Sequence, residues 1–371
     1  MSSYPEPHPY ILDIAPYKQG DSSTGEASRK TIKLSSNENP YGPSPAAVTA
    51  YRAAADSLAL YPEGSARALR EAAAERYALN PDHIVCGAGS DELIALLCSA
   101  YLAPGDNIVQ SRHGFLMYAI SAKRCGAETI FAPEKKLTAD VDAILACVNE
   151  RTKIVFLANP NNPTGTFLPR GEIRRLLDAL PSRVVLALDN AYAEYADDEH
   201  YDACDLLIDE FPNLASLHTC SKIYGLAALR AGWCYASAEI TDALHRTRGP
   251  FNISAPAIAA ASAAIRDFSY TKDMQCRNAY SRKELAGRLK TLGFECVPSQ
   301  ANFVLADCGS PERARELDAT YRRQGVIVRR VDGYGLPSYL RITVGREEEI
   351  RAVLQATESF VRAERKVTAQ A

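Results

Sequence analysis

The sequence predicts an α/β fold in which a mostly parallel sheet is sandwiched by helices, together with a smaller α+β domain. Two observations support this prediction. Short runs rich in β-branched residues alternate with segments of helical periodicity along most of the chain. These runs are apolar on both faces, as are the strands of a parallel sheet that helices cover on each side. An all-helical bundle is the alternative, and it is disfavoured because the β-branched runs have no place in it.

The expected strands of the main sheet follow one another between residues 84 and 236. They are the runs at 84–86, 107–110, 128–132, 153–158, 184–189, 214–219 and 232–236. Segments with apolar residues at helical spacing lie between most of them, among them 91–102, 138–148 and 170–180. Such alternation indicates parallel strands, because neighbouring parallel strands need a crossover connection, which is usually a helix.

The same pattern predicts how the chain divides into domains. Residues 1–45 are rich in Pro, Ser, Asn and Tyr and have little periodicity, so they are expected to form an amino-terminal arm and part of the small domain. Residues 46–265 are expected to form the large domain and residues 266–371 the small one, with a long helical region near 256–293 at their junction. The expected strands of the small domain lie in 300–307, 325–331 and 340–345, and its helices in 313–324 and 347–364.

Composition and charge exclude several classes of function. The formal net charge of -3 and the even spread of the 42 Lys and Arg residues leave no basic surface for nucleic acid. No stretch approaches the roughly 20 apolar residues of a membrane span, and the amino terminus lacks a basic and apolar leader. The ten Cys residues never occur at a two-residue spacing, so a reducing, cytoplasmic environment is expected and no metal site is predicted.

Polar residues follow four of the expected strands, at the edge of the sheet where α/β folds bind ligands. The four groups are 87–92, 159–165, 189–192 and 220–222, the last with Arg230 eight residues after Lys222. Each group has a structural explanation when it is taken alone: a tight turn for the Asn-Pro-rich loop, a helix cap for Asp189 and a solvated cation for Lys222. The Gly-rich turn by itself is a weak signal for a phosphate site.

Taken together, the four groups match the needs of one cofactor, pyridoxal 5′-phosphate (PLP). PLP requires a lysine amine for covalent attachment, an acid beside its pyridine nitrogen, and hydrogen-bond donors for its phosphate and its 3′-oxygen. Lys222 is the candidate amine and Asp189 the candidate acid. A dinucleotide-binding dehydrogenase is disfavoured because Glu92 stands where the third Gly of the Gly-x-Gly-x-x-Gly pattern belongs.

Three motifs resemble those of the fold-type I, class I/II aminotransferases: Asn-Pro-Thr-Gly at 162–165, Asp-x-Ala-Tyr at 189–192, and Ser221-Lys222 with Arg230. The resemblance extends over nearly the whole chain, from LSSNENPYGPSP to LRITVG. Five segments are similar to those of the histidinol-phosphate aminotransferase family within this superfamily. They are NENPYG, Tyr61-Pro62-Glu63, SKIYGLAALRAGW, GPFNISAPAIAA and GYGLPSYLRITVG.

The resemblance implies a role for each residue near the cofactor. Lys222, with a pKa depressed by its neighbours, is expected to carry PLP and, once the substrate frees it, to move the proton at the substrate carbon. Asp189 is expected to pair with the pyridine nitrogen, and Tyr192 and Asn162 to hydrogen-bond the 3′-oxygen. The phosphate is expected at the amino terminus of a helix. Its implied ligands are Ser90, Asp91, Thr219, Ser221 and Arg230.

Three positions depart from the family pattern. Phe115 stands where the family usually has a Tyr or another aromatic residue stacked on the cofactor ring, which removes a hydroxyl and keeps the stacking face. Asn190 replaces a common Glu and Ala88 a common Asn, at positions without a direct chemical role. The resemblance also implies that Tyr61 reaches the cofactor phosphate of the neighbouring subunit, so a homodimer with shared active sites is expected.

For the substrate, the resemblance implies a pair of arginines. Arg341 is expected to bind the α-carboxylate of glutamate, and Arg329 to join it on the phosphate of histidinol phosphate. Arg330 has no role in the family. Asn37 and Tyr41, in the NENPYG segment of the arm, are expected at the substrate, with the arm closing the site against water.

The implied reaction converts histidinol phosphate and 2-oxoglutarate to imidazole-acetol phosphate and glutamate, a step of histidine biosynthesis. An aromatic amino-acid aminotransferase for Phe or Tyr is the close alternative, and a PLP-dependent amino-acid phosphate decarboxylase is a more distant one, because all share the cofactor site. A non-catalytic binding protein of the same fold belongs to a different class. It is disfavoured because such a protein has no need of the lysine.

Overall fold

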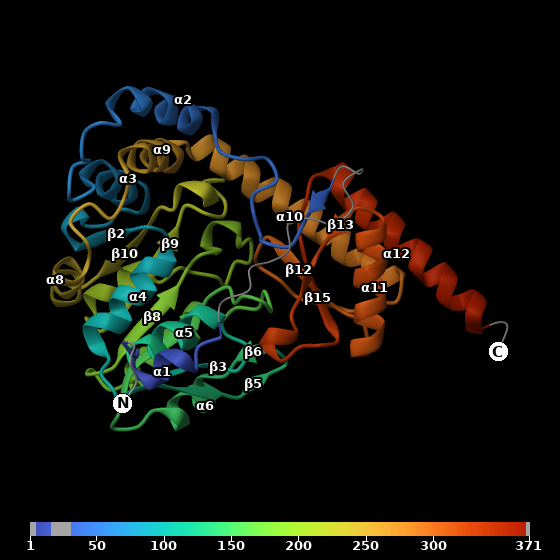
Figure 1. The fold of residues 1–371 in the computed structure, drawn as a ribbon, viewed down its shortest axis with the longest axis horizontal. Helices are drawn as coiled ribbons and strands as arrows, with labels where there is room; N and C mark the ends of the chain where they lie inside the picture. Colours follow the sequence, from blue (N-terminus) through green and yellow to red (C-terminus); the bar gives the residue numbers. More distant parts are fainter. Residues whose placement is uncertain (1–4, 16–30, 369–371) are drawn as a thin grey trace.

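The computed structural model describes residues 5–15 and 31–368 of the chain. Residues 1–4 and 16–30 of the predicted arm lie outside the described residues. A larger body is built around a seven-stranded sheet and a smaller body around a four-stranded sheet (Figure 1). Within the described ranges, no helix is long and apolar enough to cross a membrane.

The seven strands of the large sheet agree with the predicted strands to within one residue at each end. They are β2 (Ile84–Gly87), β3 (Asn107–Ser111), β4 (Glu128–Ala132), β7 (Thr152–Ala158), β8 (Val185–Asp189), β9 (Leu214–Thr219) and β10 (Gly232–Ala236). Their order is β2-β10-β9-β8-β7-β3-β4. The predicted mostly parallel sheet is confirmed, with β10 as the exception, since it runs antiparallel to both neighbours. The connection from β9 to β10 contains no crossover helix, so the chain turns back along the strand that it has just left.

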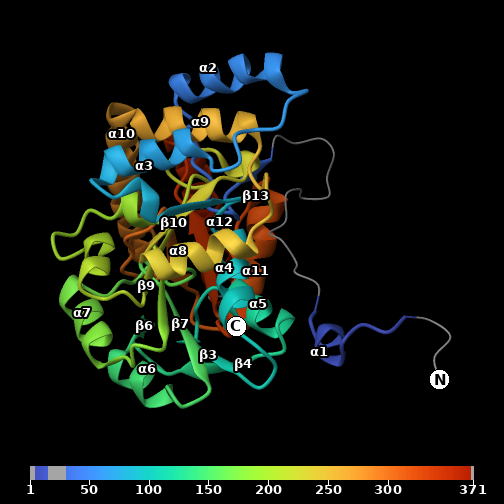
Figure 2. The ribbon, with the colours of Figure 1, turned by 90° about the vertical axis from the view of Figure 1, so that its left-hand side faces the viewer.

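Helices cover both faces of the large sheet, which explains why its strands are apolar on both sides. Val185 and Ala187 of β8 pack into one core, and Leu186 and Leu188 into the other. The first core contains α4 (Ser90–Tyr101), α5 (Leu116–Arg124) and α8 (Ala238–Thr247). The second contains α3 (Arg67–Tyr77), α6 (Val141–Cys147), α7 (Arg170–Ala179) and α9 (Ala255–Arg266), and Figure 2 shows α7 and α5 on opposite sides of the strands. By this alternation, Asp189 faces the side of α4 and α5.

The long helical region near 256–293 consists of two helices rather than one. Helix α9 ends at Arg266, and α10 (Phe268–Thr291) begins two residues later. Asp267 separates them, and its Oδ1 accepts a hydrogen bond of 3.1 Å from the backbone N–H of Tyr270. An Asp side chain at this position satisfies a backbone donor that the first turn of a helix leaves unpaired.

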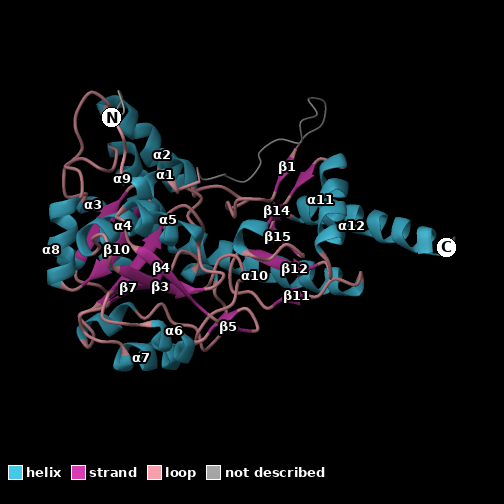
Figure 3. Cartoon of the chain, turned by 60° about the horizontal axis from the view of Figure 1, so that its bottom comes forward, coloured by secondary structure: helices cyan, strands magenta, loops and turns pink. Residues whose placement is uncertain are grey.

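The smaller body is an antiparallel sheet with helices packed on it. Its strands, in the order β11-β12-β15-β14, are β11 (Cys296–Val297), β12 (Phe303–Asp307), β15 (Tyr339–Thr343) and β14 (Arg329–Arg330). Helices α10, α11 (Pro311–Arg323) and α12 (Glu347–Thr368) complete it, and α12 extends away from the molecule in Figure 3. The strand predicted at 325–331 is split, because β13 (Val326–Ile327) pairs instead with β1 (Ile32–Lys33) of the arm.

The remaining elements are short. They are α1 (Pro9–Leu12), α2 (Pro45–Ala54), the hairpin β5 (Glu134–Lys135) and β6 (Thr138–Ala139), and the 3-10 turns Ala55–Ser57, Pro81–His83, Ala193–Tyr195, Asp205–Asp209, Ala227–Leu229 and Asp332–Tyr334. The β1–β13 pair attaches the arm to the smaller body. The domain boundaries after residues 45 and 265 stay a prediction.

The arm crosses from the smaller body to the loop that follows β9. Asn39 Nδ2 donates to the carbonyl of Ile223 at 2.7 Å. Gly225, with a φ of +68°, lies so close to Gly42 that a Cβ on Gly225 would overlap the Gly42 backbone. The close approach of these two backbones therefore depends on the absence of a side chain at residue 225.

Gly225→Ala is expected to lower the free energy of unfolding by roughly 1–2 kcal/mol for the left-handed backbone and by about 1–3 kcal/mol more for the overlap with Gly42. Gly105→Ala is the matched control, because Gly105 also has a positive φ but an added Cβ there meets no atom within 4 Å. Urea unfolding of both variants measures the difference. Equal losses would contradict the proposed close packing.

Candidate active site

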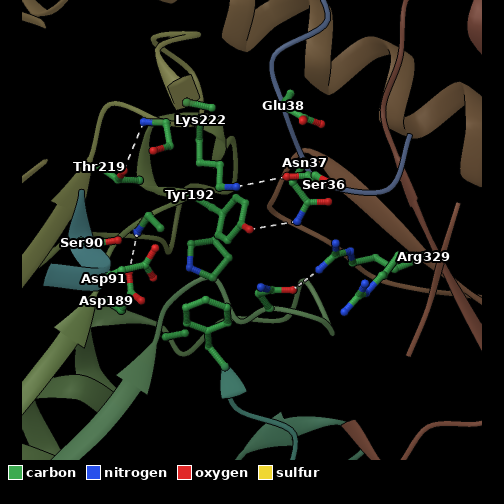
Figure 4. A pocket seen from close by; sticks show the side chains of 18 of the residues that line it. Ser36, Asn37, Glu38, Ser90, Asp91, Asp189, Tyr192, Thr219, Lys222 and Arg329 are labelled. Atoms are coloured by element: carbon green, nitrogen blue, oxygen red, sulfur yellow. Dashed lines mark hydrogen bonds between the residues drawn. The ribbon is translucent and has the colours of Figure 1, made fainter. Parts of the chain in front are cut away.

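A cavity of about 390 Å³ lies beyond the carboxyl ends of β7, β8 and β9, between the two bodies. The arm and the smaller body provide its other wall (Figure 4). All but two of the predicted site residues line this cavity. Those that line it are Asn37, Ser90, Asp91, Phe115, Asn162, Asp189, Tyr192, Thr219, Ser221, Lys222, Arg230, Arg329 and Arg341.

Lys222 enters the cavity from the loop that follows β9. Its Nζ donates to the backbone carbonyl of Ser36 at 3.3 Å and lies 5.6 Å from the centroid of the Tyr192 ring. Burial and, next, the positive charge of Arg341 lower the pKa of Lys222 to about 8, although Glu38 and Asp91 oppose the shift. A much larger fraction of this amine is therefore uncharged near physiological pH than for an ordinary lysine, as a nucleophile and proton carrier needs.

Asp189 lies at the floor of the cavity and is 4% exposed. Its Oδ1 accepts from the backbone N–H of Ala191 at 3.1 Å, and its Oδ2 accepts from the hydroxyl of Tyr118 at 2.7 Å. Burial raises the pKa of the Asp189 carboxyl, and these two hydrogen bonds oppose that rise. An ionised carboxylate in this position needs a cationic partner, such as a protonated ring nitrogen.

An anion-binding end of the cavity forms where α4 begins. The Arg230 guanidinium donates to Ser221 Oγ at 3.0 Å and to Asp91 Oδ2 at 3.1 Å. Gly89 precedes the helix with a φ of +81°, and a Cβ at this residue would collide with the Arg230 guanidinium. The lack of a side chain leaves the helix amino terminus and the guanidinium side by side, an arrangement that suits a phosphate.

Asn162 and Tyr192 connect the cofactor side of the cavity to the substrate side. The hydroxyl of Tyr192 accepts from Asn37 Nδ2 at 2.9 Å, and Asn162 Oδ1 accepts from Arg341 Nη1. Arg341 Nη2 also donates to the carbonyl of Ser35 at 2.8 Å. Each residue predicted to bind the cofactor 3′-oxygen is thus hydrogen-bonded to a residue predicted to bind substrate.

Arg329 and Arg341 face each other across the strands β14 and β15, where they are register partners. Like charges directly opposite each other in an antiparallel pair repel, and an anion bound between them would relieve that repulsion. Both residues line the cavity, and Figure 4 shows Arg329 on the side away from Asp91 and Asp189. Arg330 instead forms an ion pair with Asp332 and does not line the cavity.

Tyr41 and Tyr61 are the two predicted residues that this chain does not bring to the cavity. Tyr41 packs beneath Arg277 and Arg346, whose guanidinium carbons lie 5.3 Å and 5.6 Å from its ring centroid. The Tyr41 ring thus lies against Arg277 of α10, outside the cavity lining, and its contact with substrate stays a prediction. Tyr61 is 82% exposed on the outer surface and stacks on Phe251 at 4.6 Å.

Several residues of the site were missed by the sequence analysis. Tyr118 lies inside a helix of ordinary apolar spacing, so no local signal indicates that its hydroxyl reaches Asp189. Glu38 and Tyr334 also line the cavity, and the signal that identifies Asn37 in NENPYG extends to Glu38. Asn190, one of the family departures, is buried and donates to Ser216 Oγ at 2.8 Å on the far side of the sheet.

These contacts fit PLP. The cavity combines a lysine amine of lowered pKa, a buried carboxylate for the ring nitrogen, and an anion-binding helix terminus. The sequence model of the family "Aminotransferase class I and II" matches residues 29–356. A histidinol-phosphate aminotransferase of Dinoroseobacter shibae is 51% identical over 354 residues, covering 95% of this chain and 97% of the relative.

The chain belongs to the histidinol-phosphate aminotransferase family. A second family member, from Rhodopseudomonas palustris (strain TIE-1), is 49% identical over 361 residues, which are 97% of this chain and 99% of the relative. The crystal structure of histidinol-phosphate aminotransferase from Sinorhizobium meliloti in complex with PLP superposes with a TM-score of 0.90 at 28% identity, covering 98% of this chain and 99% of that one. The enzyme is thus a PLP-dependent aminotransferase with the type I fold.

An aromatic aminotransferase from Pyrococcus horikoshii shares the fold of this histidinol-phosphate aminotransferase family member. The two superpose with a TM-score of 0.79 at 20% identity, with 90% of this chain and 96% of that one covered. At this identity the similarity concerns the fold alone.

The rate at which the apoenzyme takes up PLP is expected to rise with pH through a midpoint near the Lys222 pKa of about 8, because only the uncharged amine attacks the cofactor aldehyde. In Arg341→Gln the midpoint should move to higher pH, since loss of a nearby positive charge makes the charged amine less unfavourable. Stopped-flow absorbance follows the uptake, with Arg362→Gln on the exposed face of α12 as control. A midpoint at the ordinary lysine value of 10.5 would contradict the assignment of Lys222 as an attacking amine of lowered pKa.

Proposed function

We propose that the enzyme transfers the amino group of histidinol phosphate to 2-oxoglutarate, forming imidazole-acetol phosphate and glutamate in histidine biosynthesis in the cytoplasm. The observation that carries the proposal is the pair Arg329 and Arg341, opposed on neighbouring strands at the cavity end away from the predicted cofactor-phosphate site. Two cations suit a dianionic phosphate, whereas an α-carboxylate needs only one arginine fork. The names of the relatives agree with this choice.

In this proposal, Lys222 is the covalent attachment point and the proton carrier. Bound PLP withdraws electrons from the substrate carbon, which makes its proton acidic. The Lys222 amine, released when substrate binds, accepts that proton and returns it to the cofactor side. Its hydrogen bond to the Ser36 carbonyl keeps the amine within the cavity, and its lowered pKa keeps it available as a base.

Asp189 pairs with the protonated ring nitrogen, and Asn162 and Tyr192 hydrogen-bond the 3′-oxygen. Phe115, at the start of α5, stacks on the ring. The phosphate takes the end of the cavity at α4, where the helix terminus and one guanidinium attract it. Its proposed ligands are Ser90, Asp91, Thr219, Ser221 and Arg230, all of which line the cavity.

At the substrate end, Arg341 holds the α-carboxylate of glutamate through a bidentate fork. When histidinol phosphate is bound, Arg341 and Arg329 share its phosphate. Asn37 reaches this space from the arm, so the arm closes the site against water. The same cavity thereby binds the α-carboxylate of glutamate and the phosphate of histidinol phosphate in turn.

We also propose a homodimer in which Tyr61 of each chain completes the other chain's cofactor-phosphate site. Tyr61 and Phe251 are large, exposed and stacked on each other, and Leu58 and Leu60 beside them are 65% and 73% exposed. A cluster of exposed apolar side chains of this kind is typical of a surface that another protein covers. A phenol hydroxyl there is suited to donate to a phosphate.

Arg329→Ala is expected to lower kcat/KM for histidinol phosphate by about ten- to hundredfold, the loss of a charged hydrogen bond. Activity with phenylalanine should change by less than about threefold, because that donor carries no phosphate. Arg341→Ala should damage both donors. A transamination assay with histidinol phosphate, phenylalanine and tyrosine as competing donors measures this.

Arg330→Ala is the matched control for this experiment, since Arg330 is the neighbouring cation and is engaged with Asp332 outside the cavity. It should leave both donors unchanged. Equal losses for the two donors in Arg329→Ala, or a preference of the unmodified enzyme for phenylalanine, would favour an aromatic amino-acid aminotransferase.

Lys222→Ala and Tyr61→Ala are expected to complement each other when their subunits are exchanged. Lys222→Ala should be inactive, and Tyr61→Ala nearly inactive at limiting PLP. A mixed dimer has one site with both an intact Lys222 and an intact Tyr61 from the partner, so an equal mixture should recover about a quarter of the normal activity. Activity after unfolding and refolding the two variants together is the measurement.

No activity should be recovered when the two variants are mixed under conditions in which their subunits do not exchange. If co-refolded mixtures recover nothing although mixed dimers form, Tyr61 does not act across the interface. A fully active monomer at nanomolar concentration would contradict the shared site as a whole.

A further inference from the structure

Tyr118 of α5 is a buried residue without an assigned role in the reaction. It is 0% exposed, and its hydroxyl donates to Asp189 Oδ2 at 2.7 Å. The structure provides Asp189 with one side-chain donor, Tyr118, and one backbone donor, the N–H of Ala191. Asp189 lies on the face of the large sheet that α4 and α5 cover, and Tyr118 packs on that face from α5.

The ring of Tyr118 is fixed from two sides. It stacks on Phe156 of β7 with a centroid distance of 4.6 Å and an interplanar angle of 6°. Its edge meets Phe115 at 5.7 Å and 85°. Because the ring cannot be displaced without disturbing both neighbours, the position of its hydroxyl oxygen is also fixed. The same side chain thus contacts the residue proposed to stack on the cofactor and the residue proposed to pair with its nitrogen.

Other charged groups near Asp189 do not replace this donor. Asp91 raises the pKa of the Asp189 carboxyl, and His218 lowers it. The His218 ring lies on the far face of the sheet, where it stacks on Trp233 at 4.8 Å and its Nε2 lies 3.0 Å from Asp205 Oδ1. Without the Tyr118 hydroxyl, Oδ2 of this buried carboxylate would lose the one side-chain partner that the described residues give it, which favours the neutral acid.

We propose that Tyr118 is a positioning residue that holds the Asp189 carboxylate ionised and oriented toward the ring nitrogen of PLP. The proposal rests on the role of Asp189 in the proposed function. Tyr118 touches neither substrate nor cofactor in this scheme and acts through Asp189. Its hydroxyl orients the carboxylate so that the oxygen lone pairs left free point into the cavity.

The test is Tyr118→Phe, which removes the hydroxyl and keeps the ring. The enzyme and the variant are each loaded with PLP carrying ¹⁵N in its ring, and the ¹⁵N chemical shift reports whether that nitrogen is protonated. The unmodified enzyme should give the protonated shift, and Tyr118→Phe a shift displaced toward the unprotonated form. The value of kcat should fall about ten- to hundredfold, as for the loss of one hydrogen bond to a charged group, with a smaller change in KM.

Tyr321→Phe is the matched control. Tyr321 is also 0% exposed, and its hydroxyl forms a 2.7 Å hydrogen bond with Thr357 Oγ1 in the smaller body, away from the cavity. This variant loses a buried phenol hydrogen bond of the same length and should keep the ¹⁵N shift and kcat of the unmodified enzyme. A second variant, Tyr118→3-fluorotyrosine, retains the donor and should keep the protonated shift even if Tyr118→Phe folds poorly.

The outcomes separate this inference from the proposed function. An unprotonated shift in the unmodified enzyme would remove the role of Asp189 and the proposal with it. A protonated shift in the unmodified enzyme that persists in Tyr118→Phe with unchanged kcat would overturn the role of Tyr118 alone. Equal losses in Tyr118→Phe and Tyr321→Phe, or an unprotonated shift with 3-fluorotyrosine, would also overturn it.

Discussion

The hydrogen bonds of Asn37 hold the two bodies together at the cavity. Its side chain donates to Tyr192 of the larger body, and its backbone N–H donates to Thr343 Oγ1 of the smaller body at 3.0 Å. Its carbonyl accepts from Asn302 Nδ2 at 3.0 Å. Asn37 is fully buried with a φ of 57°, a left-handed conformation that Asn tolerates better than most residues. Since walls from both bodies form the cavity, its shape depends on this residue of the arm together with the Arg341–Asn162 hydrogen bond.

Charge is distributed along the cavity in a way that suits a ligand with anionic groups at both ends. Arg230 and the start of α4 lie at one end, and Arg329 and Arg341 at the other, with the acid Asp189 on the floor between them. The positive charge of Arg341 also acts on Lys222, whose pKa is lowered first by burial and then by this arginine. Binding of a substrate anion at Arg341 would weaken that repulsion, so substrate recognition and the basicity of the lysine are coupled.

Sequence reasoning identified most of the site because its residues follow apolar strands. Asp189, Asn162 and Lys222 each come after a buried run, and the carboxyl ends of parallel strands meet at one edge of a sheet. Tyr118 was missed because its function depends on where a helix packs, which local pattern does not encode. The position of Tyr41 and the pairing of residues 32–33 with 326–327 were likewise set by contacts between segments far apart in sequence.

The direction of β10 fixes the spacing of two residues of the site. Because β9 and β10 are antiparallel neighbours, with Thr219 opposite Gly232, the loop between them is anchored at both ends to adjacent strands. Lys222 and Arg230 lie within this one loop, so an insertion or deletion there would shift the lysine and the arginine relative to each other. The loop thus fixes the separation of these two residues, whereas the arm and the smaller body line the substrate side of the cavity from other segments of the chain.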